Sequence, residues 1–132
     1  MRVLVDSSVW SLGLRRGGPE DHPKVRRLAA LLSAEEELFL TGTILQEILQ
    51  AFRSDLQLRK MDAYLESFPL LSLGRSGYRD AAGISRRCAR RGFGVSTTDC
   101  QIAAAAIRHH CHLLTADEDF ERIAEVSTLE VV

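Results

Sequence analysis

The stretch Leu113-Leu114-Thr115-Ala116-Asp117-Glu118-Asp119-Phe120 decides how this sequence is interpreted, because an apolar run ends there in a cluster of carboxylates. The same change occurs near the N-terminus, where Val3-Leu4-Val5 is followed directly by Asp6-Ser7-Ser8. Short apolar runs of this kind are typical of strands buried in a parallel sheet. The carboxyl ends of parallel strands open onto one crevice, so we expect the two acidic segments to lie close together.

Strand-like and helix-like segments alternate along the rest of the chain. We expect strands at 2–5, 38–40, 70–73, 111–114 and 128–132. We expect helices that begin at or just after Pro23, Thr43, Ser54, Ser76, Thr97 and Asp117. Such alternation predicts right-handed crossovers and an α/β fold, with three α/β/α layers and a mostly parallel central sheet of four to five strands.

The bulk composition is that of one globular domain, which we expect to span residues 1–132. The hydrophobic fraction is 45%, and no apolar stretch reaches the length of a membrane span. The first residues do not have the pattern of a signal peptide, so we expect a cytoplasmic protein. Cys88, Cys100 and Cys111 are too widely spaced for a zinc pair, and we expect them to be reduced and buried.

Four acidic residues stand out from the other charges. Asp99 and Asp117 lie near predicted helix starts, where a carboxylate can simply cap free N–H groups. Asp6 directly follows a buried strand, and Glu47 is flanked by apolar residues within a helix, so capping explains neither of them. Two carboxylates about 5 Å apart repel by roughly 3 kcal/mol at an effective dielectric near 20. A fold accepts several such groups in one crevice only if their pKa values rise or a cation neutralises them.

Ligands that are all oxygen favour Mg²⁺ or Mn²⁺ over zinc. A carboxylate-held ion of this type keeps most of its waters and commonly meets substrate phosphates. It can activate a bound water and stabilise a leaving oxygen. The acidic set therefore predicts hydrolysis of phosphodiester bonds.

These motifs resemble the PIN-domain nucleases. The resemblance rests on Asp6-Ser7-Ser8, on the lone Glu47, on Asp99 at the start of an Ala-rich helix, and on the run from Thr115 to Phe120. It covers nearly the whole chain, and the size is similar to that of the VapC toxins of bacterial VapBC toxin–antitoxin pairs. Ser7 stands where the family often has Thr, which keeps the hydroxyl.

The resemblance implies a metal-dependent endoribonuclease that acts as the toxin of a type II toxin–antitoxin system. It also implies a homodimer and a cognate VapB-type antitoxin. The residues that it places at the acidic, catalytic and metal-binding positions are Asp6, Glu47, Asp99 and Asp117, with Asp119 as an auxiliary metal ligand. Ser7 and Thr115 would supply supporting hydroxyls.

The net charge of −1 conceals an uneven distribution of charge. Between residues 75 and 91, six Arg side chains face a single Asp80. Arg suits phosphate contacts, although a solvated helix face explains the cluster equally well. The candidates for binding RNA are Arg15, Arg16, Arg53, Arg86, Arg87, Arg90 and Arg91. Few aromatic residues lie near them in sequence, so a platform for stacking bases is not evident.

Two other classes of protein fit a small parallel α/β domain. A phospho-acceptor receiver needs a Lys near its acidic pocket, and neither Lys24 nor Lys60 follows a strand end. A non-catalytic domain that binds RNA or protein could use the same fold, and the complete acidic set argues against it. The sequence does not identify the RNA target, the antitoxin or the preferred ion.

Overall fold

The computed structural model describes residues 1–14 and 22–132. Its strands are β1 (Arg2–Val5), β2 (Glu37–Thr41), β3 (Leu70–Leu71) and β4 (His112–Leu114). Its helices are α1 (Ser7–Leu14), α2 (Pro23–Ser33), α3 (Gly42–Gln50), α4 (Asp55–Leu65), α5 (Gly74–Arg90), α6 (Thr97–Arg108) and α7 (Asp119–Glu125).

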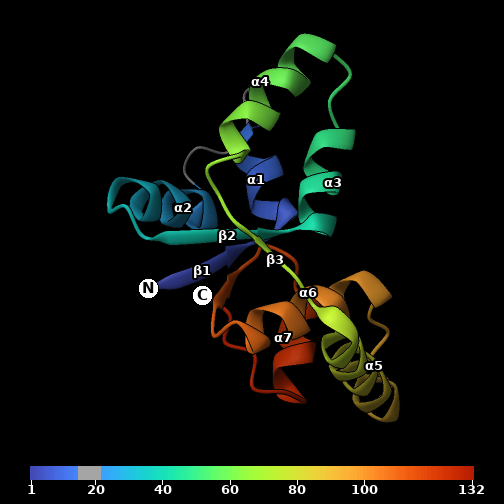
Figure 1. Ribbon diagram of the computed structural model, residues 1–132. Coiled ribbons are helices and arrows are strands. Elements are labelled where there is room, and N and C mark those ends of the chain that lie inside the picture. The colour runs from blue at the N-terminus through green and yellow to red at the C-terminus, as the bar shows by residue number, and fades with distance from the viewer. Residues whose placement is uncertain (15–21) are drawn as a thin grey trace.

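The four strands form one parallel sheet in the order β3-β2-β1-β4. β1 lies at the centre of the sheet: Val3 is paired with Leu38 of β2 on one side and with His112 of β4 on the other. Figure 1 shows α1 to α4 on one face of the sheet and α5 to α7 on the other. The predicted three-layer α/β/α architecture and parallel sheet are confirmed.

The central strand β1 and helix α6 both contribute fully buried residues to the core. Val3, Leu4 and Val5 are completely buried, and the four alanines Ala103–Ala106 are at most 2% exposed. Because alanine side chains are short, the α6 backbone can approach its neighbours closely, and this brings the start of α6 to the carboxyl end of the sheet.

The predicted strand at 128–132 is wrong. Only Val131 forms a bridge, to Leu113, and it is held by two backbone hydrogen bonds of 2.9 Å. The N–H of Leu129 donates to the Ser127 hydroxyl over 3.3 Å and so takes no part in a ladder. The predicted strand at 70–73 is also shorter than expected, because Gly74 turns the chain into α5 with a φ of +65°.

The helix starts agree with prediction to within two residues, and a side-chain cap explains the shift in α3. Thr41 accepts the Ile44 N–H over 3.1 Å, so α3 begins at Gly42 and not at Thr43. The predicted Ser54 cap of α4 is confirmed by its 3.3 Å contact with the Gln57 N–H. The predicted start of α5 at Ser76 lies two residues too late.

The three cysteines are buried, and none forms a disulfide, as predicted. Among the described residues, no helix has the length and apolar character needed to cross a membrane.

Candidate active site

The order in which the chain adds strands to the sheet reverses at β1, between β1 and β4. From β1 the chain continues to β2 and β3 on one side, and it then returns to β4 on the other side of β1. In a parallel sheet, this switch leaves a crevice at the carboxyl ends of the two strands. Asp6 follows β1 there, and its N–H donates to the carbonyl of Leu114 over 2.9 Å. The two acidic segments therefore lie side by side.

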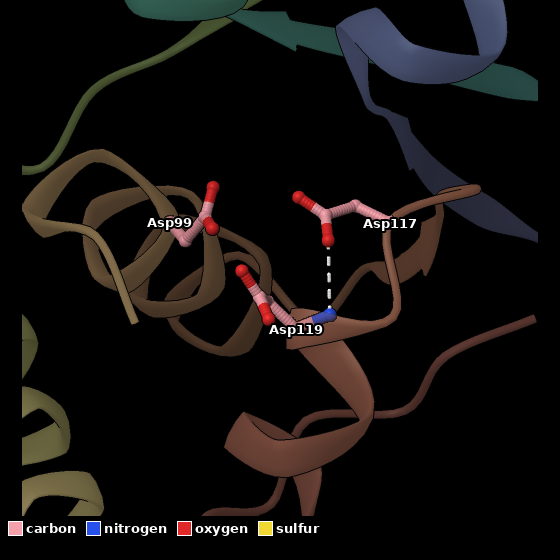
Figure 2. Close-up of side chains that lie close together, drawn as sticks. All are labelled: Asp99, Asp117 and Asp119. Carbon is pink, nitrogen blue, oxygen red and sulfur yellow. Dashed lines mark hydrogen bonds between the residues drawn. The ribbon is translucent and has the colours of Figure 1, made fainter. Parts of the chain in front are cut away.

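Three carboxylates converge at this crevice (Figure 2). Asp99 lies in the first turn of α6, Asp117 lies in the loop after β4, and Asp119 begins α7. Each can contribute one oxygen to a group in which all the oxygens are within 4.8 Å of one another. The three residues are half-buried, which leaves the group accessible to a ligand.

The loop after β4 fixes the orientation of two of these acids. The Asp117 carboxylate accepts the Asp119 N–H over 2.9 Å, so that α7 begins at Asp119 and not, as predicted, at Asp117. Asp119 in turn receives a 2.6 Å bond from Arg122. Among the residues that the structure describes, Asp99 and Asp117 have no Arg, Lys or His partner within ion-pair distance. Arg122 therefore neutralises only one of the three charges.

Asp6 is held by two hydroxyl groups. Ser8 Oγ donates to Asp6 Oδ2 over 2.6 Å, and Thr115 Oγ1 donates to the same oxygen over 2.9 Å. The two hydroxyls also accept backbone N–H groups of the loop, Ser8 from Ala116 and Thr115 from Asp117, both over 3.0 Å. Asp6 itself is only 5% exposed. These contacts, here called the hydroxyl clamp, join β1 to the loop that carries Asp117.

Ser8 was not predicted as a site residue. The sequence pointed to Ser7, which lies next to Asp6, whereas the hydroxyl that bonds Asp6 is two positions away, in the first turn of α1. A Ser two residues after an Asp at a strand-to-helix junction is the signal that could have identified it.

Glu47 lies at the edge of the acidic group. Its Oε1 accepts a hydrogen bond from Ser7 Oγ over 3.3 Å, which places the predicted Ser7 hydroxyl beside it. Burial raises the pKa of Glu47, and the negative charge of Asp6 raises it further. Glu47 is not part of the group formed by Asp99, Asp117 and Asp119, although the charge of Asp6 raises the pKa of both Glu47 and Asp99.

The electrostatics of Asp99 show that negative charge accumulates here. Burial raises the pKa of Asp99 to about 6, and the charge of Asp117 is the next largest cause. Asp6 and Asp119 contribute in the same direction, whereas a hydrogen bond at Ser96 opposes them. A carboxyl in such surroundings favours either a proton or a metal cation.

The predicted RNA-binding arginines have different surroundings. Arg15 and Arg16 lie outside the described residues, and Arg53 is exposed. Arg87 donates to the carbonyl of Val126 over 2.8 Å, and Arg91 lies 3.6 Å from Glu125, so both attach α5 to the end of α7. Arg86 and Arg90 are exposed on α5.

The hydroxyl clamp generates a prediction about stability. Replacing Ser8 by Ala removes a donor to Asp6 and an acceptor of the Ala116 N–H, so we expect unfolding to become easier by about 1–3 kcal/mol. Urea unfolding of the metal-free protein measures this change. The matched control is Ser11→Ala, an exposed serine of the same helix. Equal effects of the two changes would contradict the clamp.

The raised pKa of Asp99 generates a prediction about pH. Because folding raises this pKa from 3.8 to about 6, the folded protein binds the proton more tightly, and stability falls as pH rises across that range. Asp99→Asn should therefore stabilise the metal-free protein above pH 6 and have little effect below pH 3.8. Solvent screening limits the gain to about 1 kcal/mol.

Urea unfolding of both proteins across this pH range, with EDTA present, gives the difference directly. Glu66→Gln, at an exposed carboxyl of α4's C-terminal cap, serves as the control. A benefit of Asp99→Asn that does not depend on pH would show that the carboxyl is not destabilised by its surroundings.

Comparison with known proteins identifies the family. The PIN domain matches residues 3–126. Ribonuclease VapC11 of Mycobacterium tuberculosis is 33% identical to this chain over 130 residues, which cover 97% of the chain and 96% of the relative. The VapC ribonuclease Mb1587 of Mycobacterium bovis matches to the same extent.

Solved structures show the same fold at lower sequence identity. VapBC2 from Rickettsia felis, bound to a DNA fragment from its promoter, matches with a TM-score of 0.77 and 15% identity, covering 100% of this chain and 98% of the other. FitAcB from Neisseria gonorrhoeae matches with a TM-score of 0.72 and 20% identity, covering 98% and 95%. Fold, acidic crevice and sequence agree, and the chain therefore belongs to the PIN-domain family, in the group that contains the VapC ribonucleases.

Proposed function

We propose that this protein is a divalent-metal-dependent endoribonuclease that hydrolyses phosphodiester bonds of RNA. The observation that carries the proposal is the set of carboxylate oxygens of Asp99, Asp117 and Asp119 within 4.8 Å of one another, with Asp6 beside them at the switch point. The relatives named as ribonucleases support RNA as the substrate.

The residues present fit a hard divalent cation. The donors are carboxylate oxygens, a set that suits Mg²⁺ or Mn²⁺. We assign Asp6, Asp99 and Asp117 as the residues that would hold the ion, with Glu47 at its edge. Asp119 would be the auxiliary ligand, and its bond to Arg122 makes it the least free of the set. When bound, the ion would lower the pKa of a bound water and stabilise the charge that develops on the leaving oxygen.

The side chains of the site would position the reacting groups and move protons. Ser8 and Thr115 hold Asp6 Oδ2, and among the described residues none is hydrogen-bonded to the other carboxylate oxygen, which would bind the ion. Ser7 holds Oε1 of Glu47 in the same way. A carboxyl with a raised pKa is better matched to accept a proton near neutral pH, and Glu47 meets this condition. We assign the proton of the attacking water to Glu47, because Asp99 would hold the ion and must be ionised to do so.

The relatives also support a biological role. VapC ribonucleases and solved VapBC complexes share this chain's family or fold, which supports a toxin that a VapB-type antitoxin inhibits. In this proposal residues 1–132 form one nuclease domain, the protein is a homodimer, and it acts on RNA in the cytoplasm. The alternative is a non-catalytic domain that binds RNA or protein through the same fold.

A cleavage assay separates the proposal from its alternative. Purified protein is incubated with total bacterial RNA in EDTA, Mg²⁺ or Mn²⁺, and the fragments are resolved by electrophoresis. We expect discrete fragments with either metal and none in EDTA. Asp99→Asn and Asp117→Asn should each reduce the rate about 100-fold or more, because each removes a charged ligand.

The matched control is Glu118→Gln, an exposed acid in the same loop that is not part of the acidic group. It should cleave as the unmodified protein does. Full activity of Asp99→Asn or Asp117→Asn would refute the site assignment. If the unmodified protein cleaves no RNA under any condition, the non-catalytic alternative holds.

A further inference from the structure

Two adjoining cavities form a groove along the seam between α5 and α6. The first, of about 360 Å³, includes Thr43 and Leu71 in its lining, and the second, of about 400 Å³, includes Arg86. Tyr78 of α5 and Gln101 of α6 line both cavities, so the two adjoin, and together they are here called the α5–α6 groove.

The groove opens at the same edge of the sheet as the candidate active site, although none of the site's acids lines it. Its first cavity is lined by Thr41 and Leu71, at the carboxyl ends of β2 and β3, which is the edge of the sheet that carries Asp6. Its second cavity is lined by Thr97, in the first turn of α6, and Asp99 stands in the same turn. A chain lying in the groove would therefore pass close to the acidic group.

The side chains along the groove are those that contact unpaired nucleotides. The Tyr78 ring is 55% exposed between the two cavities, and bases stack on exposed aromatic faces. Gln101 adds an amide that can donate and accept hydrogen bonds, and Ser85 and Thr97 add hydroxyls. Arg86 is exposed, and within residues 1–14 and 22–132 no carboxylate lies within ion-pair distance of it, so it is available to a phosphate.

We propose that the α5–α6 groove binds single-stranded RNA next to the acidic site, with a base stacked on Tyr78 and a backbone phosphate held by Arg86. The inference rests on the proposed ribonuclease function and specifies its substrate as unpaired nucleotides. A double helix keeps its bases stacked on one another, so it cannot place one on Tyr78.

The groove changes the expectation that no stacking platform accompanies the arginines. Tyr78 lies eight residues before Arg86 in the same helix. In α5 the buried positions are Gly77, Ala81, Ile84 and Cys88, and Tyr78 lies outside that stripe. Of the four arginines of α5 and its C-terminal cap that were predicted to bind RNA, Arg86 is the one that lines the groove.

Charge favours RNA over a protein surface as the occupant. α5 and its C-terminal cap carry six arginines against one acid, Asp80, whose carboxylate is already paired with Arg108 over 3.0 Å. The excess positive charge would attract a phosphate backbone, whereas a second copy of this chain would present the same positive charge to itself.

The test measures binding and cleavage separately. Binding of a fluorescein-labelled, mixed-sequence single-stranded oligoribonucleotide of about twelve nucleotides is followed by anisotropy. The protein used in the binding assay carries Asp117→Asn, and the buffer contains EDTA, so that no cleavage occurs. Tyr78→Ala should weaken binding about tenfold, and Tyr78→Phe should retain it, because the ring is what stacks. A paired RNA duplex of the same length should be insensitive to Tyr78→Ala.

Arg86→Gln should also weaken binding and reduce the slope of log Kd against log salt by about 0.7. Arg79→Gln is the matched control, because Arg79 lies on the same helix but lines a different cavity with Ser127 and Thr128. Sedimentation of each variant reports its oligomeric state.

Cleavage by the unmodified protein distinguishes a failure of the groove inference from a failure of the proposed function. If it cleaves RNA in Mg²⁺ or Mn²⁺, but Tyr78→Ala and Arg86→Gln bind the oligonucleotide as their parent does, the nuclease stands and the groove inference is wrong. If it neither cleaves nor binds RNA, both fail. If Tyr78→Ala separates the protein into smaller species and binding is lost only with that change, the groove is a contact between copies of the chain and the inference is overturned.

Discussion

The hydroxyl clamp on Asp6 is the interaction on which the site depends. Asp6 leaves the central strand at the point where the sheet changes direction, and a buried carboxylate there is tolerated only with partners. Ser8 and Thr115 supply them, and the same hydroxyls accept the N–H groups of Ala116 and Asp117. One small set of bonds thus settles the position of two acids from opposite ends of the chain.

The packing of α6 supplies the third carboxylate. Ala103–Ala106 let the helix lie close to its neighbours, and Ser96 caps its first turn by accepting the Asp99 N–H over 3.0 Å. Asp99 is thereby held against Asp117 and Asp119, although burial and like charge both raise its pKa. The fold accepts a local electrostatic cost at this place, and a bound cation would remove it.

The architecture and the main acids could be predicted from the sequence, because both follow from local patterns of apolar and acidic residues. The apolar runs before Asp6 and Thr115 predicted strand ends, and parallel strands bring those ends together. The clamp was only half predicted, since the role of Ser8 depends on the first turn of α1. The groove was missed because it depends on how α5 packs against α6, which places Tyr78 beside Gln101. Arg87 attaches α5 to α7, and this role depends on tertiary contacts that no local sequence pattern encodes.

The central claim is that these carboxylates are held together for a divalent cation. Calorimetric titration of Mn²⁺ into the metal-free protein near pH 6, in buffers of different ionisation enthalpy, tests it most directly. The account predicts saturable binding with release of protons, and weaker binding with less proton release for Asp99→Asn. No binding, or the same binding and proton release in both proteins, would contradict it.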